Sequence, residues 1–68
     1  MNVFSTIYVN CYTDNANSAD EYVTQITAAG WVLSGNVYVS STYEGISLSA
    51  RYDADLGYLE IMVVYAAA

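Results

Sequence analysis

The sequence predicts an α+β domain in which one helix packs on one face of a four-stranded, mostly antiparallel sheet. Three observations indicate this fold. Apolar and polar residues alternate with the two-residue period of strands in three segments. One segment near residue 20 has helical spacing instead. Tyrosine occurs eight times, proline is absent, and Ser, Thr and Asn are frequent, a composition that favours strands over helices. The 68 residues are enough for a single domain, residues 1–68.

The first predicted strand runs from Val3 to Tyr12. Alternation places one set of side chains toward the helix: Val3, Ile7, Val9 and Cys11. The other set faces away: Phe4, Thr6, Tyr8, Asn10 and Tyr12. Cys11 is the only cysteine, so no internal disulfide can form, and we expect it to be an inert thiol buried in the core.

The single predicted helix begins at Ser18 and ends at Gly30. Ser18 and Glu21 have the spacing of a capping box, and Gly30 suits a left-handed C-terminal cap. The apolar stripe follows helical spacing and consists of Ala19, Tyr22, Val23, Ile26 and Ala29.

The second predicted strand spans residues 31–42 and is interrupted by Gly35-Asn36. The interruption fits either a bulge in one long strand or a two-residue hairpin turn, and a turn would make the sheet five-stranded. We favour the bulge because residues 31–34 form a short first arm. Trp31, Leu33, Val37 and Val39 would then share a face.

The last two predicted strands cover residues 46–53 and 58–65 and are joined by a four-residue hairpin loop, residues 54–57. If Asp53 pairs with Tyr58, Arg51 lies opposite Glu60. We expect these two side chains to form a cross-strand ion pair of structural purpose.

The charge of the chain narrows the partners that it could bind. Arg51 is the only basic residue, and the net charge is −6. This charge disfavours nucleic acid and anionic membranes, which need clustered cations. It favours a basic protein partner, although it could serve solubility alone. The longest apolar run is too short to span a bilayer, and the N-terminus lacks a signal-peptide pattern, so we expect a cytoplasmic protein.

Catalysis is not expected from this composition. Histidine and lysine are both absent, which removes the commonest acid-base and nucleophile-activating groups. Asp53-Ala54-Asp55 offers too few oxygen ligands for a calcium loop. We therefore expect no enzyme activity, no cofactor and no metal.

An interaction surface is expected on the sheet face that one short helix cannot cover. The last strand is apolar on both faces, which is typical of a central strand, and a place beside the first strand would unite six side chains. They are Phe4, Tyr8, Tyr12, Tyr58, Met62 and Val64. Exposed patches of this kind usually bind a partner, here another protein or a second copy in a homodimer. A register slip of one residue would exchange the two faces.

The functional expectation is a small acidic protein that binds and inhibits a larger, basic protein, for example one that handles nucleic acid. Asp14, Asp53 and Asp55 would steer the encounter electrostatically. In size and charge alone the chain resembles phage-encoded inhibitors of host enzymes, including anti-CRISPR proteins, which would place it in a host cytoplasm. The alternative is a structural protein that only associates with itself.

Overall fold

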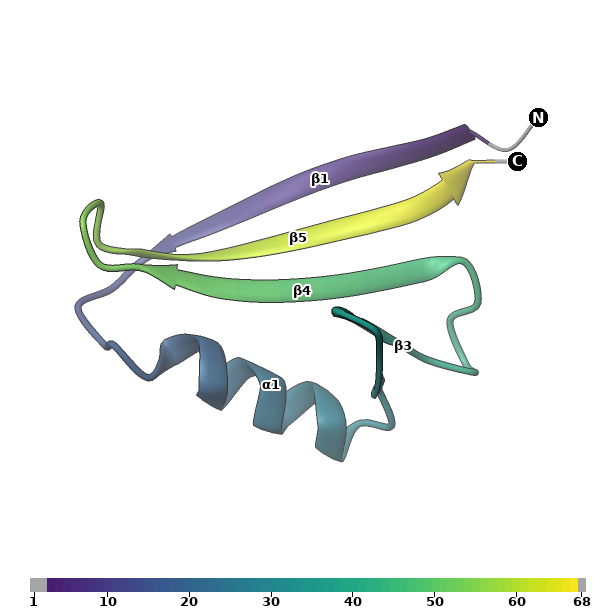
Figure 1. Ribbon diagram of the computed structural model, residues 1–68, viewed down its shortest axis with the longest axis horizontal. Helices are drawn as coiled ribbons and strands as arrows, with labels where there is room; N and C mark the ends of the chain where they lie inside the picture. The colour runs from purple at the N-terminus through teal and green to yellow at the C-terminus, as the bar shows by residue number, and fades with distance from the viewer. Residues whose placement is uncertain (1–2, 68) are drawn as a thin grey trace.

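The computed structural model describes residues 3–67 and shows one helix packed against a five-stranded antiparallel sheet (Figure 1). In chain order the elements are β1 (Val3–Tyr12), α1 (Ser18–Ala28), β2 (Val32–Ser34), β3 (Val37–Val39), β4 (Ile46–Asp53) and β5 (Tyr58–Ala67). The strands lie in the order β1-β5-β4-β3-β2. The last strand is therefore central and the first is an edge.

The expected bulge at Gly35-Asn36 is wrong. These residues form a two-residue hairpin turn, because Ser34 pairs with Val37 across it and Leu33 pairs with Tyr38. Gly35 has a φ of +66°, and glycine at the first central position is what a tight type II′ turn requires. The turn makes two short strands out of one long one, so the sheet has five strands.

The turn also corrects the expected faces of this segment. Paired residues lie on the same side of a sheet, so Leu33 shares the helix side with Tyr38 and, through it, with Leu48. Val39 pairs with Val32 and Ser47 on the opposite side. Leu33 and Val39 therefore do not share a face, contrary to the expectation from uninterrupted alternation.

The start of α1 also departs from the sequence-based prediction. Ser18 is the first helical residue and Asn17 precedes it without a side-chain cap. The Oγ of Ser18 is buried without a hydrogen-bond partner among the described residues. The Glu21 carboxylate accepts a hydrogen bond from Asn15 Nδ2 at 2.8 Å instead. The predicted capping box is therefore wrong, because the chain enters the helix one residue earlier than the motif needs.

The end of α1 is as predicted. Gly30 has a φ of +104°, a left-handed conformation that glycine adopts without steric penalty. The Gly30 amide donates to the carbonyl of Thr27, and the Trp31 amide donates to the carbonyl of Ile26 at 3.0 Å. These two bonds form a Schellman motif, which satisfies carbonyls at the helix end and turns the chain toward β2.

The hydrophobic core is thin. The helix packs mainly on β4 and β5, and among the described residues Leu48 is the only buried apolar side chain, with 8% exposed. The chain exposes 4809 Å². A compact protein of 7.4 kDa exposes about 4,200 Å², so the excess is about 600 Å².

Candidate protein-interaction surface

The sheet side opposite the helix carries the side chains that the sequence singled out. The pairing of β1 with β5 sets Tyr8 opposite Met62 and Tyr12 opposite Tyr58. The rings of Tyr12 and Tyr58 meet edge to face, with centroids 6.0 Å apart. We call this set the aromatic surface: Phe4, Tyr8, Tyr12, Tyr58, Met62 and Val64.

The aromatic surface is open to solvent at its β1 side. Phe4, Tyr8 and Tyr12 are 62%, 59% and 84% exposed, whereas the β5 members are half-buried between neighbouring strands. The exposed rings of β1 therefore lie beside the partly covered apolar side chains of β5. Tyrosine suits such a surface because its ring gives contact area while its hydroxyl stays hydrated.

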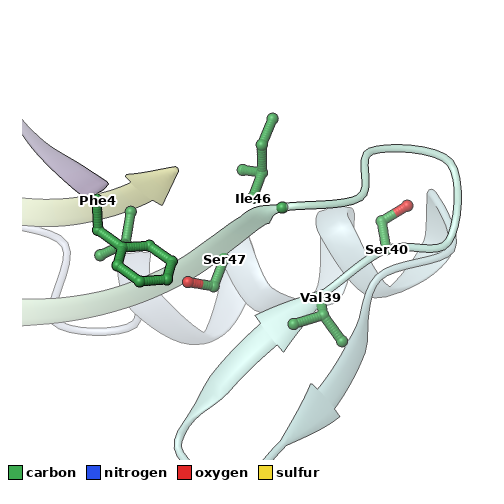
Figure 2. A pocket seen from close by; sticks show the side chains of 7 residues that line it. Phe4, Val39, Ser40, Ile46 and Ser47 are labelled. Carbon is green, nitrogen blue, oxygen red and sulfur yellow. The ribbon is translucent and has the colours of Figure 1, made fainter. Parts of the chain in front are cut away.

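A shallow hollow continues the aromatic surface toward the opposite edge of the sheet (Figure 2). Its volume is about 210 Å³, and Phe4, Val64, Ser47 and Val39 line it. The Phe4 ring reaches over toward Ser47 in Figure 2. Sequence reasoning missed Val39 as a member of this side, because its face depends on the turn at Gly35.

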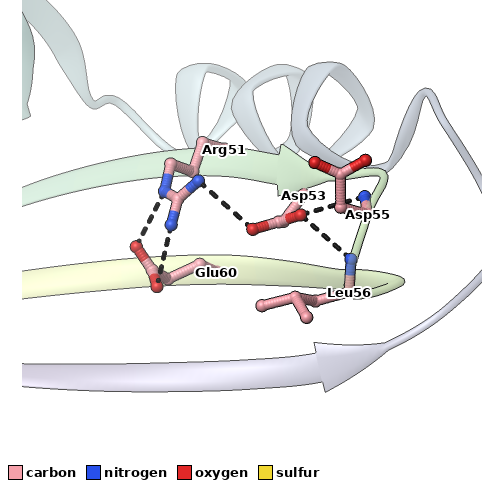
Figure 3. A network of polar contacts seen from close by, with 5 residues as sticks. All are labelled: Arg51, Asp53, Asp55, Leu56 and Glu60. Atoms are coloured by element: carbon pink, nitrogen blue, oxygen red, sulfur yellow. Dashed lines mark hydrogen bonds and ion pairs between the residues drawn. The ribbon is translucent and has the colours of Figure 1, made fainter.

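A polar network on the same side lies around Arg51 (Figure 3). Its Nε donates to Glu60 Oε1 at 3.0 Å, and its Nη1 lies 3.7 Å from an Asp53 carboxylate oxygen. The hydrogen bond to Glu60 is the main cause that raises the pKa of Arg51. The predicted pair of Arg51 with Glu60 is confirmed, and the lone cation is held by acidic neighbours.

Two acidic loops meet at one end of the sheet, beside Tyr12. The Thr13 amide donates to the Gly57 carbonyl at 3.0 Å, and the Tyr52 hydroxyl donates to the Thr13 carbonyl at 3.0 Å. These bonds hold the loop after β1 against the β4–β5 hairpin. Asp14 and Asp55, one in each loop, are both exposed.

Asp53 differs from the other two steering candidates. One of its carboxylate oxygens accepts the amides of Asp55 and Leu56, both at 3.0 Å, as an Asx turn does (Figure 3). The other oxygen faces Arg51. Its charge therefore stabilises the hairpin, so the sequence placed Asp53 correctly near the acidic end but missed its structural task.

The helix side of β1 is uncovered as well. Val3, Ile7 and Val9 are exposed there, and so is Cys11, which corrects its expected burial. Alternation gave Cys11 the right face, but α1 packs mainly over β4 and β5 and leaves the edge strand uncovered. A groove of about 450 Å³ runs between α1 and the Cys11 end of β1.

The described residues contain neither a metal-ligand cluster nor a membrane-spanning helix. Within residues 3–67, no three acidic or cysteine side chains gather closely enough to hold a metal ion. The helix in this part of the chain is too short and too polar to cross a bilayer. Comparison with known proteins found no matching family model, curated protein or solved structure.

Proposed function

We propose that this chain works by binding and blocking a larger protein of basic character, with the aromatic surface as its contact. The observation that supports this most is the exposure of Phe4, Tyr8 and Tyr12 above the half-buried β5 side chains on one sheet face. Aromatic side chains in this arrangement are typical of the energetic centre of protein interfaces.

The charge distribution supports a basic partner rather than an acidic one. The net charge is −6, and Arg51, the single basic residue, is neutralised by Glu60 and Asp53. Asp14 and Asp55 project from the loops beside Tyr12. A cationic surface would be drawn to this end first and would then settle over the rings, which raises the association rate more than the final affinity.

Binding rather than catalysis is proposed because the surface offers contact area and few reactive groups. Its only polar side-chain groups are phenol hydroxyls, and the neighbouring Arg51 is paired with Glu60. Blocking would be steric: a protein of this size seated over a basic cleft excludes whatever the cleft normally holds. Acidic loops beside an aromatic surface agree with the polar rim and apolar centre of protein interfaces.

The test is affinity capture with matched variants. Wild-type protein should retain a basic protein from a lysate of the native host, and Tyr8→Ala together with Tyr12→Ala should reduce retention at least tenfold. The control is Tyr43→Ala, since Tyr43 is another exposed tyrosine, which stacks on Trp31 away from the aromatic surface. Equal loss with Tyr43→Ala would contradict the proposal.

The steering part is tested on the purified pair. Asp14→Asn with Asp55→Asn should slow association severalfold and weaken its dependence on salt, while dissociation changes little. Asp53 is left intact because its carboxylate holds the hairpin turn. An association rate that ignores both the variants and the salt concentration would remove the electrostatic half of the proposal.

Self-association is the second candidate function. The observation that favours it is the exposure of Val3, Ile7 and Val9 on the helix side of β1, which the aromatic surface does not include. A partner seated on the opposite face would leave these side chains in water. A second copy that meets the edge of β1 would reach both faces at once.

A further inference from the structure

The edge strand β1 has the composition of a central strand. It carries no charged residue over its ten positions, and large apolar side chains on both of its faces are exposed. Natural edge strands are usually short, charged or interrupted by proline, which prevents pairing with other chains. The opposite edge, β2, is only three residues long. The protein therefore has one long, uncharged edge.

The backbone of this edge is ready to pair. The Thr13 amide donates to Gly57, so odd-numbered residues of β1 direct their backbone groups toward β5. The even-numbered residues then direct their amides and carbonyls outward. They are Phe4, Thr6, Tyr8, Asn10 and Tyr12.

We propose that two copies of this chain pair through β1 in antiparallel fashion, with Tyr8 opposite Tyr8 of the second copy, and so join two five-stranded sheets into one of ten strands. The inference deepens the second candidate function. If this pairing failed, the proposed binding of a foreign protein would stand, because that is measured by affinity capture and the pairing is measured by cross-linking and by mass.

The register follows from symmetry and backbone direction. A two-fold axis perpendicular to the sheet keeps each face in line across the junction, so even residues pair with even residues and odd with odd. The two registers with the longest overlap are centred on Tyr8 or on Ile7. The Tyr8-centred register pairs all five outward-pointing residues, whereas the Ile7-centred register leaves Tyr12 unpaired.

The Tyr8-centred register also matches side chains of like kind. Phe4 faces Tyr12 of the second copy, and Ile7 faces Val9. Thr6 faces Asn10, which joins polar to polar. Aromatic and β-branched side chains are among the cross-strand pairs that stabilise antiparallel sheets. The Ile7-centred register would set Phe4 against Asn10 and lose this match.

The charges and areas agree with a second copy as the occupant. Since β1 is uncharged, the net charge of −6 places no like charges directly opposite each other along the junction. The exposed side chains on both faces of β1 are the area that a second copy paired at this edge would cover: Val3, Phe4, Ile7, Tyr8, Val9 and Tyr12. The two aromatic surfaces would merge into one continuous strip with an acidic loop at each end.

Cross-linking tests the register directly. In the Tyr8-centred pairing, Ser5 lies opposite Cys11 of the second copy, in a non-hydrogen-bonded pair whose Cα atoms are about 4.5 Å apart. That separation suits a disulfide. Ser5→Cys, treated with oxidised glutathione, should become a covalent dimer in high yield. Within one chain the two positions are about 20 Å apart along the strand, so only an intermolecular bond can form.

Val3→Cys is the matched control, because Val3 would face Cys11 of the second copy only in the Ile7-centred register. We expect Ser5→Cys to cross-link and Val3→Cys not to. The double variant Ser5→Cys with Cys11→Ser should stay uncross-linked. Cross-linking through Val3→Cys instead, or through neither variant, would overturn the proposed pairing.

Light scattering after size exclusion tests the association itself. Wild-type protein should have twice the chain mass of 7.4 kDa. Thr6→Pro removes an outward-pointing amide that β5 does not use, so the chain should keep its circular dichroism spectrum and become a monomer. A monomeric wild type, or a folded Thr6→Pro variant that still dimerises, would overturn the proposal.

Discussion

Leu48 lies at the centre of the covered sheet side. It pairs with Val63 on β5 and with Tyr38 on β3, under the helix that packs on β4. No other apolar side chain among the described residues is buried to the same extent. With so few atoms shielded from water, the loss of one well-packed side chain is a large part of the stability.

Leu48→Ala should therefore lower the free energy of unfolding by about 2–5 kcal/mol, the range measured for buried leucines. Urea denaturation of the purified variant measures this change. Leu56→Ala is the matched control, because Leu56 is 64% exposed in the hairpin loop and should change stability by less than about 0.5 kcal/mol. Equal effects of the two variants would mean that Leu48 is not the centre of the core.

The helix is the element whose boundaries are set most clearly by local chemistry. Its C-terminal end is closed by the two Schellman hydrogen bonds at Gly30 and Trp31. A Cβ atom built at Gly30 would meet nothing within 4 Å, so space is not the reason for glycine there. The reason is the φ of +104°, which other residues rarely adopt.

Gly30→Ala should lower stability by about 1–2 kcal/mol through backbone strain alone. Thermal unfolding followed by circular dichroism measures the loss. Gly30→Asn should recover part of it, since asparagine tolerates the left-handed region better than alanine. A neutral Gly30→Ala would show that the helix end relaxes to a different conformation at little expense.

The bounds and type of each strand were more predictable from the sequence than the burial of its side chains. The bounds of β1 and β4 and the pairing of Arg51 with Glu60 were confirmed, because alternation and hairpin length depend on nearby residues. The face of Cys11 was also predicted, but the prediction that it would be buried was wrong, because it is exposed. Burial depends on where the helix rests, and no local pattern records that α1 would lie over β4 rather than β1.

The error at Gly35 came from a choice between a bulge and a turn, and the pairing of β2 with β3 decides it. The capping box at Ser18 was wrong because the helix begins one residue earlier than the motif needs. A three-residue arm is too short to reveal a strand by periodicity, yet β2 forms because β3 pairs with it. The faces of the aromatic-surface members were predictable because each lies on a long, uninterrupted strand, whereas Val39 lies on a three-residue strand after the turn at Gly35.

For the whole molecule, stability depends on how much of the sheet is covered by other parts of the protein. The fold measures 39 × 24 × 17 Å, which is an extended plate. Its one helix covers part of one broad side and leaves the other side open. A pair of such plates joined at β1 would lengthen the sheet and remove its long edge. Association should then contribute to the stability of each chain.

The melting temperature of the wild-type protein should therefore depend on its concentration. A tenfold increase should raise the midpoint by about 3–6 °C, since it stabilises the dimer by about 0.7 kcal/mol per chain and small domains shift by about 4–8 °C per kcal/mol. Calorimetry at three concentrations measures the shift. Thr6→Pro should give a constant midpoint, and a constant midpoint for the wild type would argue for a self-sufficient monomer.

The pairing of β1 with β5 has a consequence for how the chain reaches its native state. Val3 pairs with Ala67, so β1 leaves the ribosome well before β5, the strand to which it must hydrogen-bond. Hairpins such as β4–β5 need only short loops to close, so we expect them to assemble early and β1 to dock last. Until β5 is available, the apolar strand β1 is exposed and can pair with another newly made chain. Expression at lower temperature or lower density should accordingly improve the soluble yield.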